Sequence, residues 1–524
     1  MHIKAYKGPS IIICIGLIIT LLGIFLRVYH RGQAMYFFGD QGIQFLVAYE
    51  IAFHHFVPKV GPLISFEHIA TPPHFFYYLA AFVRMNPSPL MVSIGFIVMN
   101  LFGVLCLWFF TKFVAGEQTA MWVATLTLVS ASMIEAARSI WDPYPTFLFV
   151  SLYLALTEYA YRKCVFWVYC VGLLSYIYSV ALYPTSILLL PFVFTRAVSQ
   201  CRVFRIRSTG KQTVIVLAVI VGEFSLVFGP WVAQTHLLIW KSFERIVWTS
   251  TRNISLLHFG SLFFSDMNSV IYDLFRIWPT LPKLNIPYTV LYWVIVVAIG
   301  VTLLSTVNKQ SVLGAIRWFL GQNCQWLVIG FFSLVFLGEP MYAYRYLPFY
   351  PFIFLFLGWW FRTWITSRLF VRRIVSAVTL CLFLVANGLS WRYTTLTHPR
   401  KQYEKAINEA QTVIEDLQIR HATINDIGIH VFTPDDIYDY DGAPVYYVLH
   451  IGHGYPVKLN DLGNDVDRSA TEYRPLVYLV CDGFSVSMRR TRCINTFLNR
   501  WHYYTLVTTY SPSPNTGVSV FYHL

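Results

Sequence analysis

The hydrophobic positions of this sequence form long runs instead of alternating with polar ones. Residues 9–26 are eighteen in a row without a charge, and similar runs recur as far as residue 390. About 20 apolar residues are enough to cross the roughly 30 Å hydrocarbon core of a bilayer as a helix. The first run lacks a small-x-small cleavage site and leads into more membrane sequence, which favours a retained anchor over a signal peptide. The pattern therefore predicts an α-helical protein that crosses a membrane many times.

Basic residues between the runs indicate which side of the membrane each loop occupies. Of the 524 residues, 56% are hydrophobic and 12% charged, and the formal net charge is +13. Much of the excess Lys and Arg sits in short loops, a pattern typical of cytoplasmic loops and not of a nucleic-acid-binding surface. Placing these loops on one side predicts eleven spans, with the N-terminus inside and the C-terminus outside: 9–28, 89–112, 118–137, 144–161, 165–181, 185–198, 212–231, 287–306, 322–338, 346–361 and 374–391.

The segment 74–85 is apolar but too short to be counted as a further span. About twelve residues cannot cross the bilayer as a helix. Its aromatic cluster at 75–78 suits a helix that lies at the membrane interface, where aromatic rings favour the headgroup level. We therefore expect an interfacial helix within the first outer loop, residues 29–88.

Most of the chain outside the predicted spans falls on the outer face. Residues 1–391 form the predicted transmembrane domain, and residues 392–524 read as a small extracytoplasmic α/β domain. The tail shows a helical stretch at 401–418 and strand-like stretches at 427–432 and 476–480. It also holds Cys481 and Cys493, for which a disulfide and two free thiols are both compatible with the sequence.

Asp40 is the first candidate catalytic residue. It lies in the segment Phe38-Gly39-Asp40-Gln41-Gly42, directly after the first span, where glycines permit close approach of a ligand to the backbone. A helix is predicted to begin there, and a helix N-terminus favours an anion. The alternative is that Asp40 merely caps this helix.

A second acidic segment follows about a hundred residues later. Arg138 and Asp142 lie at the outer end of the third predicted span, in the stretch 138–145. The topology puts Asp142 on the same face as Asp40 only if 74–85 does not cross the membrane. An aspartate before a proline can also be an ordinary turn residue.

The third candidate segment is 339–348, where Tyr344 and Arg345 stand at the outer mouth of the tenth predicted span. The forked N–H donors of arginine suit a phosphate. Interfacial snorkelling would also place an arginine there. Arg84 and His74 are further substrate-binding candidates on the same face. Glu67 and His68 could bind a metal, but their spacing is not that of a metal site, so no cofactor is predicted and metal dependence stays open.

Several of these segments together resemble the C-type (GT-C) glycosyltransferase superfamily. Within it the chain is most similar to family 39 and its relatives, the protein O-mannosyltransferases and bacterial aminoarabinose transferases. Residues 39–51 (GDQGIQFLVAYEI) resemble the bacterial pattern G-D-E/Q-G-x-x-x-x-V-A-x-E/R-I, and weaker likenesses follow at 61–63, 73–79, 138–144, 181–185 and 345–351. The resemblance covers about residues 9–365. It departs from the family at Gln41, Asp142 and Tyr183, and it does not extend to the tail.

This resemblance implies a membrane glycosyltransferase. Such an enzyme moves a sugar from a polyprenyl-phosphate-linked donor in the membrane to a glycan, lipid or protein acceptor on the extracytoplasmic side, here of a bacterial inner membrane. Asp40 would be the general base of an inverting displacement. Arg345, with Arg84 or Arg138, would stabilise the leaving phosphate, while Asp142, His74 and Glu67 would position substrate.

Two other classes remain compatible with the sequence. A transporter or flippase of lipid-linked sugars would also have many spans and basic cytoplasmic loops. Its ionisable groups would sit near the bilayer midplane, where Glu223 is the strongest candidate. A scaffold that displays the tail would need neither a donor nor the outer-face charges. Release of polyprenyl phosphate distinguishes the enzyme from both.

Overall fold

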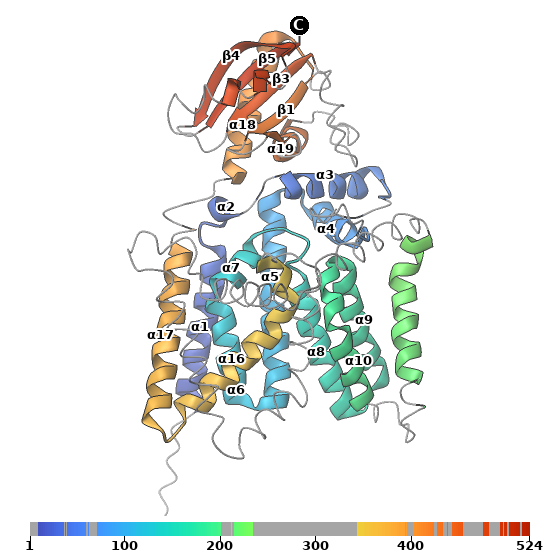
Figure 1. Cartoon of the computed structure of the whole chain (residues 1–524), viewed down its shortest axis with the longest axis vertical. Coiled ribbons are helices and arrows are strands. Elements are labelled where there is room, and N and C mark those ends of the chain that lie inside the picture. Colours follow the sequence, from blue (N-terminus) through green and yellow to red (C-terminus); the bar gives the residue numbers. More distant parts are fainter. Residues whose placement is uncertain are drawn as a thin grey trace, which may run out of the picture.

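The computed structural model describes most of the helical part and the core of the tail. The described residues are 9–58, 71–200, 214–233, 343–392, 402–453, 475–481 and 493–523, with gaps of up to four residues inside these ranges, and the single residues Gly61, Lys211 and Thr395. A bundle of long helices carries two short helices across one end, and an α/β unit lies beyond them (Figure 1). We call the end that bears the α/β unit the upper end and the opposite one the lower end.

The long helices match most of the predicted spans that fall within the described residues. They are α1 (Pro9–Val28), α5 (Pro89–Ala115), α8 (Thr146–Lys163), α9 (Phe166–Leu182), α10 (Leu190–Ser199), the helix Val214–Ala233, α16 (Tyr350–Ile365) and α17 (Phe370–Arg392). The 3-10 turns η1 (Pro184–Leu189) and η5 (Ala343–Phe349) lead into α10 and α16. The predicted spans 287–306 and 322–338 lie outside the described residues.

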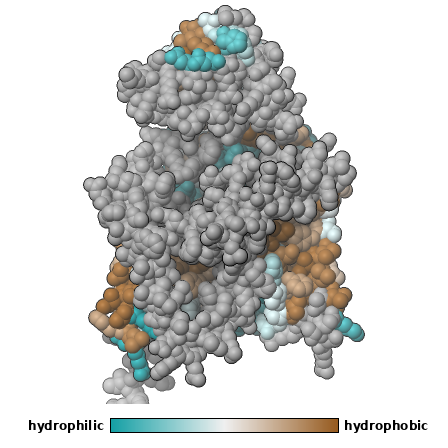
Figure 2. Space-filling model, in the orientation of Figure 1, coloured by the Kyte–Doolittle hydropathy of each residue, from teal (hydrophilic) through white to brown (hydrophobic). Residues whose placement is uncertain are grey.

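By length and hydropathy alone, three helices of the described part can cross a membrane: α5, Val214–Ala233 and α17. A fourth counts if a bent pair is taken as one span. Large apolar side chains are exposed along these helices, for example Val98 of α5 and Val378 of α17. Hydrophobic residues are accordingly visible on the flanks of the helical part (Figure 2). Such exposure is expected where lipid replaces water as the solvent.

The predicted span 118–137 is a bent pair of helices. The chain forms α6 (Glu117–Val129) and α7 (Ala131–Arg138), which meet at Ser130 with a bend of 61°. A bend leaves backbone groups unpaired, and side chains from two other helices bind them. Arg27 of α1 donates to the carbonyls of Leu128 (2.8 Å) and Thr127 (3.4 Å). Asn387 of α17 accepts from the Ala131 amide at 2.7 Å.

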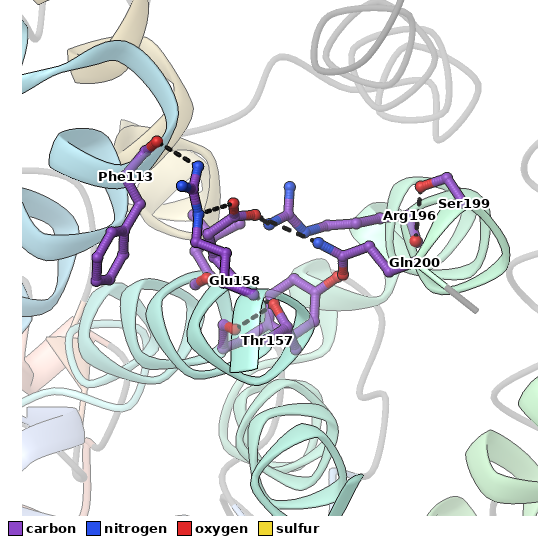
Figure 3. Close-up of polar contacts among 9 residues, drawn as sticks. Phe113, Thr157, Glu158, Arg196, Ser199 and Gln200 are labelled. Carbon is purple, nitrogen blue, oxygen red and sulfur yellow. Dashed lines mark hydrogen bonds and ion pairs between the residues drawn. The ribbon is translucent and has the colours of Figure 1, made fainter. Parts of the chain in front are cut away.

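A buried ion cluster joins three helices at the lower end of the bundle (Figure 3). Glu158 of α8 accepts from Arg162 at 2.9 Å, from Arg196 of α10 at 2.6 Å and from Gln200 at 3.3 Å. Arg162 also donates to the carbonyl of Phe113 in the last turn of α5. The basic residues Arg162 and Arg196 therefore lie at the end of the bundle that is farthest from the α/β unit.

Two short helices lie across the upper end, α3 (Gly39–His54) and α4 (His74–Met85), after the single-turn helix α2 (Arg31–Ala34). The predicted interfacial segment 74–85 is thus one short helix of twelve residues. It buries Phe75, Phe76 and Leu79 in a hydrophobic cluster that also includes Phe45 of α3. These helices form a platform between the bundle and the α/β unit.

The tail forms a five-stranded sheet in the order β2-β1-β3-β5-β4. Its strands are β1 (Ile427–Phe432), β2 (Ile437–Tyr438), β3 (Leu476–Cys481), β4 (Tyr504–Ser513) and β5 (Thr516–His523). Only β1 and β3 pair in parallel, and every other pairing is antiparallel. Helices α18 (Gln402–Arg420) and α19 (Ala443–His453) complete the unit. The helix and two strands expected from the sequence correspond to α18, β1 and β3.

Aromatic side chains dock this unit on the platform. Tyr447 of α19 packs edge-on against Phe45 of α3, with ring centroids 5.1 Å apart, and against Phe37. Its hydroxyl donates to the carbonyl of Pro87 at 2.6 Å, just before α5 begins. Edge-to-face aromatic pairs of this kind add about 0.5–1.5 kcal/mol beyond the area they bury. The tail therefore holds the helix that carries Asp40.

Candidate active site

Two carboxylates face each other at the upper end. Asp40 is in the first turn of α3, and Asp142 lies in the loop between α7 and α8. Gln44, one turn beyond Asp40 on the same face of α3, donates a hydrogen bond to Asp142. Asp142 is 7% exposed and Gln44 4% exposed. The structure thus brings together the two acids that the sequence placed on one face.

The pair has unusual acid–base properties. Burial and the charge of Asp40 raise the pKa of Asp142 to about 8, although hydrogen bonds from its own backbone and from Gln44 act to lower it. Burial also raises the pKa of Asp40 above its ordinary value. The negative charge of Asp40 disfavours ionisation of Asp142, so Asp142 is mainly protonated at neutral pH. One member of the pair is then a base and the other a hydrogen-bond donor.

Asp40 itself has no structural task among the described residues. The helix begins at Gly39, so Asp40 is its second residue and not its N-cap, and no described donor contacts its carboxylate. Its negative charge is favoured by the positive end of the helix. A partly buried carboxylate without a described protein partner is available to accept a proton from a substrate.

His74 lies at the start of α4 among aromatic rings. The rings of Tyr178 in α9 and Phe228 are 6.0 and 6.1 Å from it. Burial lowers the pKa of His74, while a hydrogen bond to the backbone of Val227 opposes the shift. Its Nδ1 atom is buried and has no partner among the described residues. A neutral imidazole in this setting can accept a hydrogen bond from a hydroxyl group.

The aromatic cluster connects His74 to the Asp142 loop. Tyr178 packs on Phe149 with ring centroids 5.0 Å apart, and Phe149 stands in the first turn of α8. Asp142 precedes the same helix by four residues. His74 and Asp142 are therefore both held at the upper end of α8.

Arg84 lies away from the carboxylates. Its guanidinium donates to the carbonyl of Ala52 at 2.9 Å and stacks over Phe53 at 5.1 Å. Ala52 is twelve residues beyond Asp40 on α3, which corresponds to about 18 Å along the helix axis. The described contacts of Arg84 thus join the ends of α3 and α4, and they do not direct it to a phosphate beside Asp40.

The guanidinium of Arg138 also donates its hydrogen bonds to other parts of the protein. Its Nε donates to the carbonyl of Arg27 at 3.2 Å, and its Nη1 donates to Thr395 at 2.7 Å. Its Nη2 donates to the carbonyls of Leu26 and Tyr29, the latter at 3.0 Å. An arginine has five N–H donors, so these four bonds leave one. Arg138, expected as a candidate to stabilise the leaving phosphate, therefore has one N–H group that is not bound to the protein in these contacts.

The remaining predicted residues are placed only in part. Tyr344 and Arg345 belong to η5, which packs against α8 and η1, but their side chains lie outside the described residues. Glu67 and His68 lie outside them altogether. Within the described ranges no group of three or more His, Cys, Asp or Glu residues converges on one point. At the described site, the side-chain oxygen atoms that can act as metal ligands are those of the two carboxylates and of the Gln44 amide.

No protein-family model matches the sequence, and no curated protein matches it. Solved structures do match it. ArnT from Cupriavidus metallidurans bound to undecaprenyl phosphate aligns with 98% of this chain and 97% of its own, at 12% identity and a TM-score of 0.50. The chain has the GT-C fold. The apo oligosaccharyltransferase from Archaeoglobus fulgidus aligns with 98% of this chain and 75% of its own, at 12% identity and a TM-score of 0.47.

Three residues that organise this site were not singled out from the sequence. Gln44 could have been found, because its spacing of four from Asp40 puts both side chains on one helix face. Arg27 and Asn387 lie within apolar runs, where a polar residue signals a function or a buried partner without identifying which. Their partners are backbone groups at the α6–α7 bend, and no pattern in the sequence predicts that bend.

Proposed function

We propose that the protein is a membrane glycosyltransferase that moves a sugar from a polyprenyl-phosphate donor to an acceptor on the extracytoplasmic side. The observation that carries the proposal is Asp40, a partly buried carboxylate with a raised pKa and no described protein partner, facing Asp142. The GT-C fold supports the same conclusion, since ArnT of that fold is bound to undecaprenyl phosphate. A donor anchored in lipid suits a site at the end of a helical bundle.

Asp40 acts as the general base in this proposal. It takes the proton of the acceptor hydroxyl or amine as that group attacks the anomeric carbon. The bond between the anomeric carbon and the phosphate oxygen breaks, and polyprenyl phosphate leaves with its electron pair. A single displacement inverts the anomeric configuration. General-base catalysis of this kind contributes about 10²–10⁴-fold to a rate.

Asp142 is mainly protonated at neutral pH and positions the reacting groups. As an acid it donates a hydrogen bond to a substrate oxygen, and Gln44 fixes its orientation. His74 accepts a hydrogen bond from a hydroxyl group of the sugar or acceptor. Arg345, in η5 at the same end of the bundle, is the proposed cation for the leaving phosphate.

The proposed orientation rests on charge and on cysteine chemistry. Arg162, Arg196 and Arg362 lie at the lower end, and basic residues of membrane proteins concentrate on the cytoplasmic side. Cys493 of the tail is disulfide-bonded, while the side chain of Cys481 lies outside the described residues. Disulfides persist in oxidising compartments. Both features favour an upper end that faces away from the cytoplasm, as in a bacterial inner membrane.

The experiment that tests the function follows the fate of the donor. Purified protein in proteoliposomes is given polyprenyl phosphates that carry different radiolabelled sugars, together with an extract of envelope glycans, lipids and proteins as acceptor. A transferase releases free polyprenyl phosphate and moves the label to a water-soluble or larger product. Label that crosses the bilayer while still attached to the lipid would identify a flippase instead. A donor left intact and unmoved would contradict both activities.

A further inference from the structure

The backbone segments that lead to the two carboxylates meet at one side chain. Arg138 is the last residue of α7 and precedes Asp142 by four residues. Three of its four hydrogen bonds go to carbonyls at the end of α1, on Leu26, Arg27 and Tyr29. Tyr29 in turn precedes Asp40 by eleven residues. A single guanidinium therefore links the chain that enters α3 to the chain that enters the Asp142 loop.

Arg138 and the end of α1 also bind the start of the tail. Arg138 donates to the hydroxyl of Thr395, three residues beyond the end of α17. Trp391, in the last turn of α17, donates its indole N–H to the carbonyl of Leu26 at 3.0 Å. Arg138 is only 3% exposed, so these bonds form away from water, where an unmade hydrogen bond is costly. The end of α17 is thus tied to the same turn of α1.

From these contacts we infer that Arg138 is a positioning residue that sets the separation of Asp40 and Asp142 by fastening the end of α7 to the end of α1. The consequence for catalysis rests on the proposed function, but the geometry does not. Without this link the Asp142 loop would no longer be fixed to the segment that enters α3. Asp142 would then draw away from Asp40 and gain water.

The acid–base behaviour of the pair reports this separation directly. Burial of Asp142 and the charge of Asp40 hold the pKa of Asp142 high, and Gln44 is the side chain that donates to it. Asp40 is the titratable group that faces Asp142 among the described residues. If the two carboxylates moved apart and Asp142 became more hydrated, the pKa of Asp142 would fall toward the ordinary aspartate value of about 4.

The variant Arg138→Lys tests the inference with the charge kept. An ammonium cannot reproduce the planar fork that reaches three carbonyls and a hydroxyl. The chain offers a matched control in Arg362, whose Nη1 donates to the carbonyl of Ala115 at 2.8 Å and to the hydroxyl of Thr119 at 3.0 Å. Arg362 likewise fastens a helix end, but at the lower end of the bundle. Arg362→Lys therefore removes the same chemistry at a distance from the carboxylates.

The measurement is an infrared titration of the protonated carboxylic acid in reconstituted protein, with the band assigned by its loss in Asp142→Asn. The wild-type band should disappear with a midpoint of about 8. In Arg138→Lys the midpoint should fall by about one pH unit or more, whereas Arg362→Lys should keep the wild-type midpoint. Thr395→Val, which removes one acceptor at nearly constant volume, should shift it in the same direction by less.

The result that would overturn the inference is a wild-type midpoint in both Arg138→Lys and Thr395→Val. An equal shift in Arg362→Lys would also overturn it, because the effect would then be general loosening of the bundle. Should Arg138→Lys fail to fold, Thr395→Val decides the outcome by itself. Since no donor is present, this titration stands or falls independently of transferase activity.

Discussion

The raised pKa of Asp142 makes the stability of the protein depend on pH in a defined direction. In the folded protein this acid titrates at about 8, whereas its ordinary value is 3.8. Between these values the folded state holds a proton that the unfolded state has released. Stability must therefore fall as pH rises through this window and level off above it. The contribution of this group is about −1.4 kcal/mol for each pH unit, and about 6 kcal/mol in total as an upper bound.

The variant Asp142→Asn isolates this contribution. The amide resembles the protonated acid in shape and carries no charge, so the variant lacks the penalty at high pH. Between pH 6 and pH 8 the free energy of unfolding of wild type should drop relative to the variant by about 2–3 kcal/mol. Histidines such as His74 titrate in both proteins, and their effects cancel in the difference.

Denaturant unfolding in detergent micelles, followed by tryptophan fluorescence, provides the measurement at each pH. Glu117→Gln is the control, because Glu117 is 67% exposed and its ion pair with Lys112 contributes little. Its difference from wild type should be flat over the same range. The difference in free energy of unfolding between wild type and Asp142→Asn should change with pH. If it were flat, or if it favoured wild type at high pH, the raised pKa of Asp142 in a buried carboxylate pair would be refuted.

Two further predictions concern the bundle. Glu158→Gln should destabilise the protein by about 3–5 kcal/mol, because it leaves the buried charge of Arg196 without its partner, and a thermal melt with no change would contradict that role. Gly358→Ala should cost about 1–3 kcal/mol in the same assay, because a Cβ there would lie 2.4 Å from Val123 Cγ2, whereas Gly388→Ala, with nothing within 4 Å, should not share this cost. Equal melting temperatures for the two alanine variants would argue against close packing of α6 on α16.

Hydropathy predicted most of the described bundle because membrane spans are constrained by length and composition. The runs at 9–28, 89–112 and 374–391 became α1, α5 and α17 with ends shifted by at most four residues. The proximity of Asp40 to Asp142 followed from the shortness of 74–85, a single feature that decided which loops share a face. Both inferences depend only on the length and composition of segments, because the thickness of the bilayer decides which segments are long enough to cross it.

The bend at Ser130 and the tasks of the arginines could not be read in this way. The bend exists because Arg27 and Asn387, from helices distant in sequence, bind the backbone groups it releases. Arg84 and Arg138 were expected at a phosphate because of their charge and predicted side. Their described hydrogen bonds go to carbonyls at helix ends and, for Arg138, also to the hydroxyl of Thr395. Hydropathy gives the side of the membrane on which a cation lies, but not which acceptor it meets.

The most direct test of the account is the transfer rate of Asp40→Asn beside that of Glu50→Gln. Both residues are acids on α3, but Glu50 pairs with His54 near the end of the helix that lies away from Asp142. With labelled polyprenyl-phosphate sugar in proteoliposomes, Asp40→Asn should lose about 10²–10⁴-fold in turnover while Glu50→Gln stays close to wild type. Turnover by Asp40→Asn at the wild-type rate would contradict the assignment of Asp40 as the base.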